Sequence, residues 1–490
     1  MKKIKHNVTK KSYSKLKKTH RANTINNQLM KKDTTKVNTK LILLICAEVC
    51  IALTIFGWLK WQDYILNHSP VIITAINQVE KTQPPSVQTG KILNAEALQS
   101  YSPTQTTELI KQTNKNFDLP VTSGISKQVI RYTSSDGHSN DVPIYARVYM
   151  PLSPNKQLPV LAFAPGTTGL GDGCAASIEQ PQKRNWANYD SLMAAYASQG
   201  YIVIITDYEG MRDPARIHHY MVGDVEGRAV LDSLRAIKNL DSTKKSVDQN
   251  AFFTGGYSQG GHAAYWADAI ASKYAPEIKL KGAIGFGPVT SVNETLTDAI
   301  TNNANINWFG PFVVVSYQDW YKHTFPVDKI LVPQFTKNLR SDVLRECIDT
   351  ATHFWPSNIG ANKSAEVYTA EFIAAAKSGN IANNSAYTQF ANDMSANIVG
   401  TVKTLTPKLI NQGQYDNVVL SRQSKAGYQR MCASGNSTNF KEYSTNPYAI
   451  QGYNPKGLVD HYQTMNASFK DTLGWMEARM ADIPLVDSCL

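Results

Sequence analysis

The chain has 490 residues, enough for one large domain with extensions, and carries a formal net charge of +11 at pH 7. Residues 1–40 hold thirteen Lys or Arg and one acidic residue, Asp33, so the rest of the chain is close to neutral. The basic balance is therefore local, and nothing in it favours nucleic-acid binding by the folded part.

An apolar segment follows the basic residues. Residues 41–59 are mostly apolar and lie between two lysines, and their number is near the roughly 20 that a helix needs to span a bilayer. Glu48 is the one discordant residue in the segment. Because segments rich in Lys and Arg stay on the cytoplasmic side, we predict a basic cytoplasmic tail at 1–40 and a single-pass transmembrane signal anchor at 41–61. The remainder would then lie on the extracytoplasmic side, periplasmic or extracellular.

Residues 62–120 are polar and are predicted to form a stalk or wrapping segment ahead of a catalytic domain at 121–490. In that domain, apolar runs alternate with amphipathic helices, which predicts an α/β fold with a doubly wound, mostly parallel sheet. The expected strands are 128–132, 145–149, 159–164, 201–206, 251–254, 281–286 and 405–411, and the expected helices are 189–198, 224–240 and 262–270. The first two strands flank a turn signal at 134–137, which indicates an antiparallel hairpin. At about 289–403 the alternation stops, and this stretch is predicted to be a helical lid.

Gly256-Tyr257-Ser258-Gln259-Gly260 matches G-x-S-x-G, the nucleophile elbow that exposes a serine hydroxyl on a sharp strand-to-helix turn. A short apolar strand precedes it and a helical run follows it, as such a turn requires. The glycines on both sides of the serine leave room for the strained backbone. We therefore predict Ser258 as a catalytic nucleophile.

A serine nucleophile needs an imidazole base and an acid that orients the imidazole. In doubly wound hydrolases the acid and then the histidine follow the serine along the chain. Asp416 follows a predicted strand and a glycine turn beyond the lid, and His461 is the only histidine after Asp416. We predict Asp416 and His461 as the partners of Ser258, with Asp460 as the competing acid. Three further histidines are assigned structural roles: His218, His219 and His262.

An ester hydrolase also needs two N–H donors for the negative oxygen that develops during the reaction. The first predicted donor is the backbone of Gln259, which follows the nucleophile. The second is expected in the glycine-rich loop after the strand 159–164, with Thr167 as the candidate and Gly166 as the next choice.

Four of the six cysteines lie beyond the predicted anchor: Cys174, Cys347, Cys432 and Cys489. An even set in an oxidising compartment predicts two disulfides, with three possible connectivities. No cysteine or histidine spacing indicates a zinc site. We expect neither a metal nor an organic cofactor.

Together these segments resemble the secretory lipase family within the α/β-hydrolase superfamily. The resemblance covers about residues 120–490 and rests on 165–169, 174–177, 207–210, 231–236, 256–261 and the Asp416 and His461 segments. It implies hydrolysis of acyl esters, including triacylglycerols, beneath a helical lid, and it implies the disulfides Cys174–Cys347 and Cys432–Cys489. Pro165 stands where the family usually has histidine, and the basic tail and apolar segment are unusual for the family.

The sequence thus predicts a membrane-anchored serine carboxylic-ester hydrolase, lipase- or esterase-like, that acts on lipid or other apolar acyl esters. An acyltransferase or a peptidase could use the same three residues, because pocket shape decides the acceptor and the leaving group. A non-catalytic surface protein on a hydrolase scaffold is the alternative from another functional class.

Overall fold

The computed structural model describes residues 70–85, 88–112, 115–138, 140–180, 186–302, 306–322, 324–348, 363–448, 457–486 and 489. Within these ranges no helix combines the length and the apolar character that crossing a membrane requires. The predicted basic tail at 1–40 and the predicted anchor at 41–61 lie outside the described residues, so both stay predictions from the sequence.

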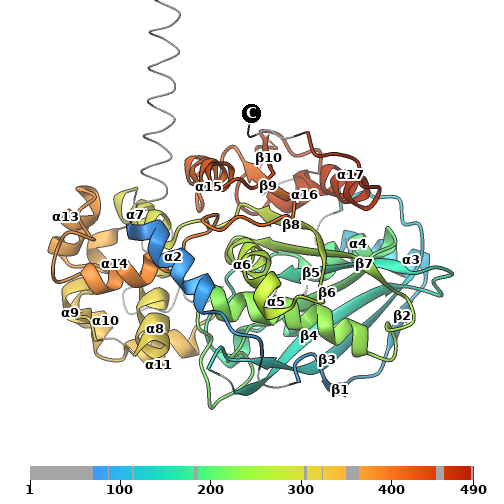
Figure 1. The fold of residues 1–490 in the computed structure, drawn as a ribbon, viewed down its shortest axis with the longest axis horizontal. Helices are drawn as coiled ribbons and strands as arrows, with labels where there is room; N and C mark the ends of the chain where they lie inside the picture. Colours follow the sequence, from blue (N-terminus) through green and yellow to red (C-terminus); the bar gives the residue numbers. More distant parts are fainter. Residues whose placement is uncertain are drawn as a thin grey trace, which may run out of the picture. The chain divides into compact units, whose positions relative to one another are not determined.

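Within the described residues, ten strands form one mixed sheet at the centre of the fold (Figure 1). Its order is β1-β3-β4-β6-β5-β7-β8-β9-β10, and β2 also pairs with β3. The strands from β6 to β10 in this order run parallel, whereas β1, β2, β3 and β4 pair antiparallel with their neighbours. Their bounds are β1 (Ile92–Ala95), β2 (Gln99–Tyr101), β3 (Ile125–Ser135), β4 (Asp141–Pro151), β5 (Leu158–Ala164), β6 (Ile202–Thr206), β7 (Val247–Tyr257), β8 (Leu280–Phe286), β9 (Lys408–Gly413) and β10 (Thr438–Tyr443).

The predicted α/β-hydrolase architecture is confirmed, with a larger antiparallel part than expected. β3 and β4 form the predicted hairpin, and Asp136 at its tip accepts the backbone N–H groups of His138 and Asn140. The segment 62–120 supplies β1 and β2 at the sheet edge, although its polar composition predicts no strand there.

Helices cover both faces of the sheet, and α5 and α6 cross in front of it in Figure 1. Alternate residues of each strand point to opposite faces: Ala162 packs on the side of α5 and α6, and Phe163 packs on the side of α4. The bounds are α2 (Pro70–Lys81), α3 (Pro103–Lys111), η1 (Asp172–Cys174), η2 (Ala176–Ile178), α4 (Tyr189–Ser198), α5 (Gly223–Asn239), α6 (Gln259–Tyr274), α15 (Ser421–Ala433), α16 (Thr464–Ala467) and α17 (Phe469–Met480).

A helical insertion connects β8 to β9, at the position predicted for the lid (yellow and orange in Figure 1). Its own apolar core includes Phe312, Phe372 and Phe390. Its elements are α7 (Val292–Thr301), α8 (Phe309–Tyr321), α9 (Val327–Ile330), α10 (Pro333–Thr336), α11 (Leu339–Arg345), η3 (Ser364–Glu366), α13 (Ala370–Lys377) and α14 (Thr388–Ser395).

Two disulfides cross-link the fold. Cys174–Cys347 ties the loop after β5 to the helical insertion, and Cys432–Cys489 ties α15 to the C-terminal segment. Both are the pairings that the family resemblance implies.

Candidate active site

The predicted elbow is a sharp turn between β7 and α6. At this turn Ser258 has φ 56° and ψ −116°, a strained conformation for a residue with a side chain. Two glycines permit the turn: a Cβ on Gly256 would lie 2.0 Å from the carbonyl oxygen of Gly260, and a Cβ on Gly260 would lie 1.9 Å from that of Ala164. The backbone around Ser258 therefore makes the sharp strand-to-helix turn that the motif predicts, and this turn packs against the end of β5.

The predicted acid and base are hydrogen-bonded to each other. His461 Nδ1 lies 2.7 Å from Asp416 Oδ2, and both side chains are buried. The other carboxylate oxygen, Oδ1, accepts the backbone N–H groups of Val418 and Val419 at 2.9 and 2.8 Å. Because Asp416 is an acceptor, Nδ1 carries the proton, which leaves Nε2 of a neutral His461 free to accept one. The competing acid, Asp460, accepts the backbone N–H of a residue in the next turn instead, at 3.1 Å.

Several contacts bring Ser258 and this pair to the same end of the sheet. The Ser258 N–H donates to the carbonyl of the last residue of β8 at 2.9 Å. The next residue, Gly287, has φ 51°, and a Cβ there would lie 3.0 Å from Asp416 Oδ2 and 3.1 Å from His461 Nδ1. The His461 ring also lies 4.7 Å, centroid to centroid, from the ring of Tyr257. The Ser258 hydroxyl has no hydrogen-bond partner among the described residues. The structure therefore contains the hydrogen bond between His461 and Asp416, but no hydrogen bond between Ser258 and His461.

The two predicted oxyanion donors have different surroundings. Gln259 is the first residue of α6, where a helix offers no carbonyl to the backbone N–H. In the loop after β5, the Gly166 N–H donates to the Tyr189 hydroxyl at 2.6 Å and is therefore occupied. The Thr167 hydroxyl is hydrogen-bonded to the Tyr220 hydroxyl at 2.8 Å, and this bond involves the side chain of Thr167 and not its backbone N–H. The geometry thus favours the backbone of Thr167 over that of Gly166 as the second donor.

A layer of buried polar side chains lies behind the elbow, and the sequence analysis did not predict it. Glu226 on α5 contacts Gln259 and His262, and His218 also contacts Gln259. Glu226 is only 1% exposed, although the charged residues near it in α5 form a sequence pattern typical of a solvent-facing helix surface. Among the described residues, no group of three or more His, Cys, Asp or Glu side chains is arranged to hold a metal ion.

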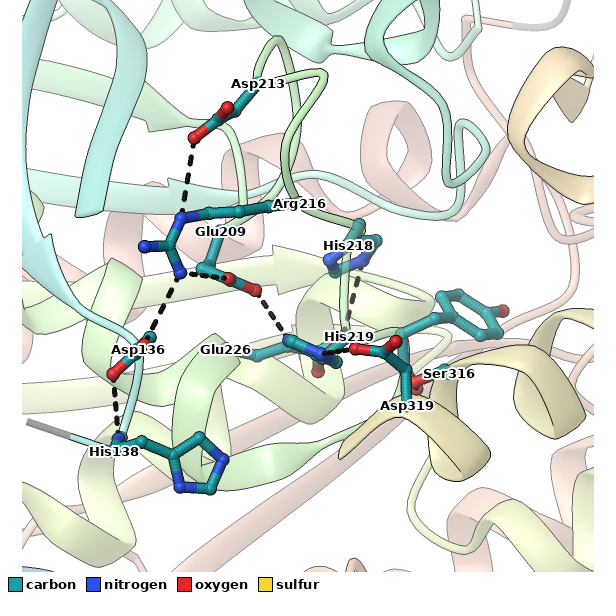
Figure 2. Close-up of polar contacts among 12 residues, drawn as sticks. Asp136, His138, Glu209, Asp213, Arg216, His218, His219, Glu226, Ser316 and Asp319 are labelled. Carbon is teal, nitrogen blue, oxygen red and sulfur yellow. Dashed lines mark hydrogen bonds and ion pairs between the residues drawn. The ribbon is translucent and has the colours of Figure 1, made fainter. Parts of the chain in front are cut away.

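A second polar cluster joins the core to the helical insertion (Figure 2). It consists of His219, Glu209 and Asp319, and we call it the His219 cluster. His219 Nδ1 lies 2.7 Å from Glu209 Oε2, and Nε2 lies 3.0 Å from Asp319 Oδ2 on α8. Burial alone would lower the pKa of His219, but the hydrogen bonds and charges of Asp319 and Glu209 outweigh it and raise the pKa to about 9. The cluster is therefore an ion pair between α8 and the loop after β6, and these histidine contacts were not expected from the sequence.

A family model described as secretory lipase matches residues 186–488. The chain belongs to the secretory lipase family. Among its relatives, Lipase A of Moesziomyces aphidis is 29% identical over 178 residues, which is 34% of this chain and 36% of the relative. Lipase 10 of Candida albicans is 24% identical over 307 residues, covering 61% of this chain and 59% of the relative. These matches therefore span about a third to three fifths of the relatives' own length.

Two solved structures share the fold of this secretory lipase family member. One is the rice cell wall degrading esterase LipA from Xanthomonas oryzae, with a TM-score of 0.61, 17% identity and coverage of 81% of this chain and 97% of that one. The other is Candida antarctica lipase A, with a TM-score of 0.57, 18% identity and coverage of 85% and 89%. At this level of identity the likeness shows the fold alone.

Proposed function

We propose that this protein is a serine carboxylic-ester hydrolase that acts on lipid or other apolar acyl esters. The observation that carries the proposal is the buried hydrogen bond between His461 and Asp416, at the end of the sheet where the strained elbow holds Ser258. A serine, then a carboxylate and then an imidazole along the chain supply the nucleophile, the orienting acid and the base of acyl transfer in doubly wound hydrolases.

In the proposed reaction, Ser258 Oγ attacks the ester carbonyl while His461 Nε2 takes its proton, and Asp416 stabilises the imidazolium. The N–H groups of Gln259 and Thr167 stabilise the oxyanion. The tetrahedral intermediate collapses when the carbon–alkoxide bond breaks and His461 returns the proton to the leaving alcohol. Water then attacks the acyl-enzyme by the same route, which releases the carboxylic acid and restores Ser258.

The substrate class and the location rest on further support. The family is described as secretory, and one relative is named as a secreted triacylglycerol lipase of Malassezia furfur. Two disulfides within the catalytic part fit an oxidising, extracytoplasmic compartment. We include in the proposal a membrane anchor at 41–61, which rests on the sequence pattern alone.

The test compares Ser258→Ala with Ser233→Ala in hydrolysis of p-nitrophenyl esters of increasing acyl length and in labelling by a fluorophosphonate. Ser233 is a matched control, because it is buried on α5 and donates only to a carbonyl of its own helix. We expect Ser258→Ala to lose hydrolysis and labelling with an unchanged thermal midpoint, and Ser233→Ala to keep both. Full activity in Ser258→Ala would refute the proposal, and preferential acyl transfer to added alcohols or amines would reassign it to an acyltransferase.

A further inference from the structure

The carboxylate of Glu226, which the proposed reaction does not use, lies beneath the elbow and has three hydrogen-bond partners on two segments, the loop before α5 and the start of α6. Oε1 accepts the backbone N–H of Met221 at 2.9 Å and the side-chain amide of Gln259 at 2.7 Å. Oε2 lies 2.8 Å from His262 Nδ1, one turn further along α6. A buried carboxylate with this set of partners fixes the start of α6 relative to α5.

The side chain of Gln259 is held through its amide nitrogen. Nε2 has two acceptors, Glu226 Oε1 at 2.7 Å and His218 Nε2 at 2.6 Å. Burial lowers the pKa of His218 to about 3, so the ring is neutral and Nε2 can accept. Gln259 Oε1 is buried with no hydrogen-bond partner among the described residues. The orientation of this side chain therefore depends on Glu226 and His218.

The same residue carries the first oxyanion donor of the proposed reaction in its backbone. Its N–H belongs to the free first turn of α6, so no helical hydrogen bond fixes the direction in which it points. We propose that Glu226 is a positioning residue, which holds the Gln259 side chain so that the Gln259 backbone N–H points at the developing oxyanion. This inference rests on the proposed function, because it assigns a role within the same reaction.

A carboxylate behind an oxyanion site would oppose the reaction if its charge were unbalanced, and His262 balances it. His262 Nε2 lies 2.8 Å from the carbonyl oxygen of Asn397, which can only accept, so Nε2 carries a proton. The contact between Nδ1 and Glu226 requires one more proton, on either partner. The pair therefore carries no net charge, whichever partner holds that proton.

The pair of Glu226 and His262 is also connected to the helical insertion, through the hydrogen bond of His262 to Asn397. The side-chain amide of Asn397 donates to the hydroxyls of Tyr317 and Tyr321 on α8, at 3.2 and 2.7 Å. Its side-chain oxygen accepts the N–H of Gly223 at 2.8 Å, at the start of α5. Asn397 thus connects the proposed positioning network to two packed helices, α8 and α5, which give the rigid support that a precisely directed donor requires.

The experiment measures kcat and KM for a p-nitrophenyl ester in Glu226→Gln, Gln259→Met and the double variant. Asp232→Asn is the matched control, because Asp232 is also a fully buried carboxylate on α5 that pairs with Arg235 on its own helix, and its other partners, Ser134 and Tyr274, lie away from the elbow. Loss of a whole oxyanion donor lowers kcat by about 10²- to 10³-fold, so a misdirected donor should lower it by roughly 10- to 100-fold. We expect this loss in both single variants with KM unchanged, no further loss in the double variant, and full kcat in Asp232→Asn.

Binding of an alkyl trifluoromethyl ketone separates positioning from mere stability, because its adduct with serine carries an oxyanion. Its inhibition constant should rise by the same factor by which kcat/KM falls in Glu226→Gln, and should not change in Asp232→Asn. If Glu226→Gln fails to fold, the Gln259→Met variant alone tests the positioning role, since it leaves the carboxylate of Glu226 in place. Unchanged kcat in the single variants, or losses that multiply in the double variant, would overturn the positioning role. Retained activity in Ser258→Ala would instead refute the proposed function.

Discussion

Removal of one carboxylate from the His219 cluster should weaken the attachment of α8 to the core in a pH-dependent way. Asp319→Asn takes away the negative charge 3.0 Å from His219 Nε2 and leaves Glu209 at 2.7 Å from Nδ1. The pKa of His219, about 9 against an ordinary 6.5, corresponds to about 3 kcal/mol of preference for the charged ring. Asp319 is the more exposed of the two carboxylates, at 25% against 2%, so we assign it roughly 1–2 kcal/mol.

The sign of the pH dependence follows from the direction of the pKa shift. The pKa of His219 is higher in the folded protein than in the unfolded chain, so its contribution is fully present below about pH 6.5 and is lost as the pH rises towards 9. Wild-type stability should therefore fall across this window, and the fall should be smaller in Asp319→Asn. Asp319 also contacts Arg340 and Lys322, but both cations are exposed, and exposed ion pairs contribute little to stability.

The assay is urea unfolding of both proteins at pH 6, 7.5 and 9.5, with Asp342→Asn as the control. Asp342 lies in the same helical insertion and pairs with Arg345 on its own helix, so its removal changes the charge without affecting the His219 cluster. Asp319→Asn should be less stable than wild type at pH 6, with a difference that shrinks by pH 9.5. A difference that is independent of pH, or an NMR titration that places the pKa of His219 near 6.5, would refute the reasoning.

Three further predictions concern the site and its cross-link. Asp416→Asn should lower kcat by roughly 10⁴-fold in ester hydrolysis, because the His461 tautomer is no longer fixed; near wild-type turnover would exclude this acid. Gly287→Ala should lose activity beyond its stability loss, because its Cβ would lie about 3 Å from Asp416 and His461. Gly379→Ala, with φ 70° and open space around its Cβ, is the control that should keep its activity. Cys347→Ser should cost about 2–5 kcal/mol in unfolding measurements, and an unchanged midpoint would show that the bridge to Cys174 contributes nothing.

The sequence predicted those parts of the fold that local chemistry determines. The elbow was predictable because a strained serine needs small neighbours and a strand-to-helix context, both visible within twenty residues. The parallel strands were predictable because burial on both faces makes them continuously apolar. The edge strands β1 and β2 were not, since their side chains are mostly exposed and only the ladder with β3 makes them strands. The disulfide pairing followed from the family resemblance, since spacing left three connectivities open.

The polar networks could not be predicted from the sequence for a different reason, which the charged residues of α5 illustrate. This helix carries Asp224, Glu226, Arg228 and Asp232, a pattern typical of a solvated helix face, yet all four side chains are buried. They are buried because α5 packs between β3 and α6, where each charge meets a partner. Some pairs are local, such as Arg228 with Asp224, but Glu226 meets His262 of α6, which is distant in the sequence. Burial of an unpaired carboxylate would cost several kcal/mol, so the burial of Glu226 depends on a partner that no local pattern reveals. A substitution that is conservative by composition, such as Glu226→Gln, should therefore have a far larger effect here than the surface-like pattern of α5 indicates.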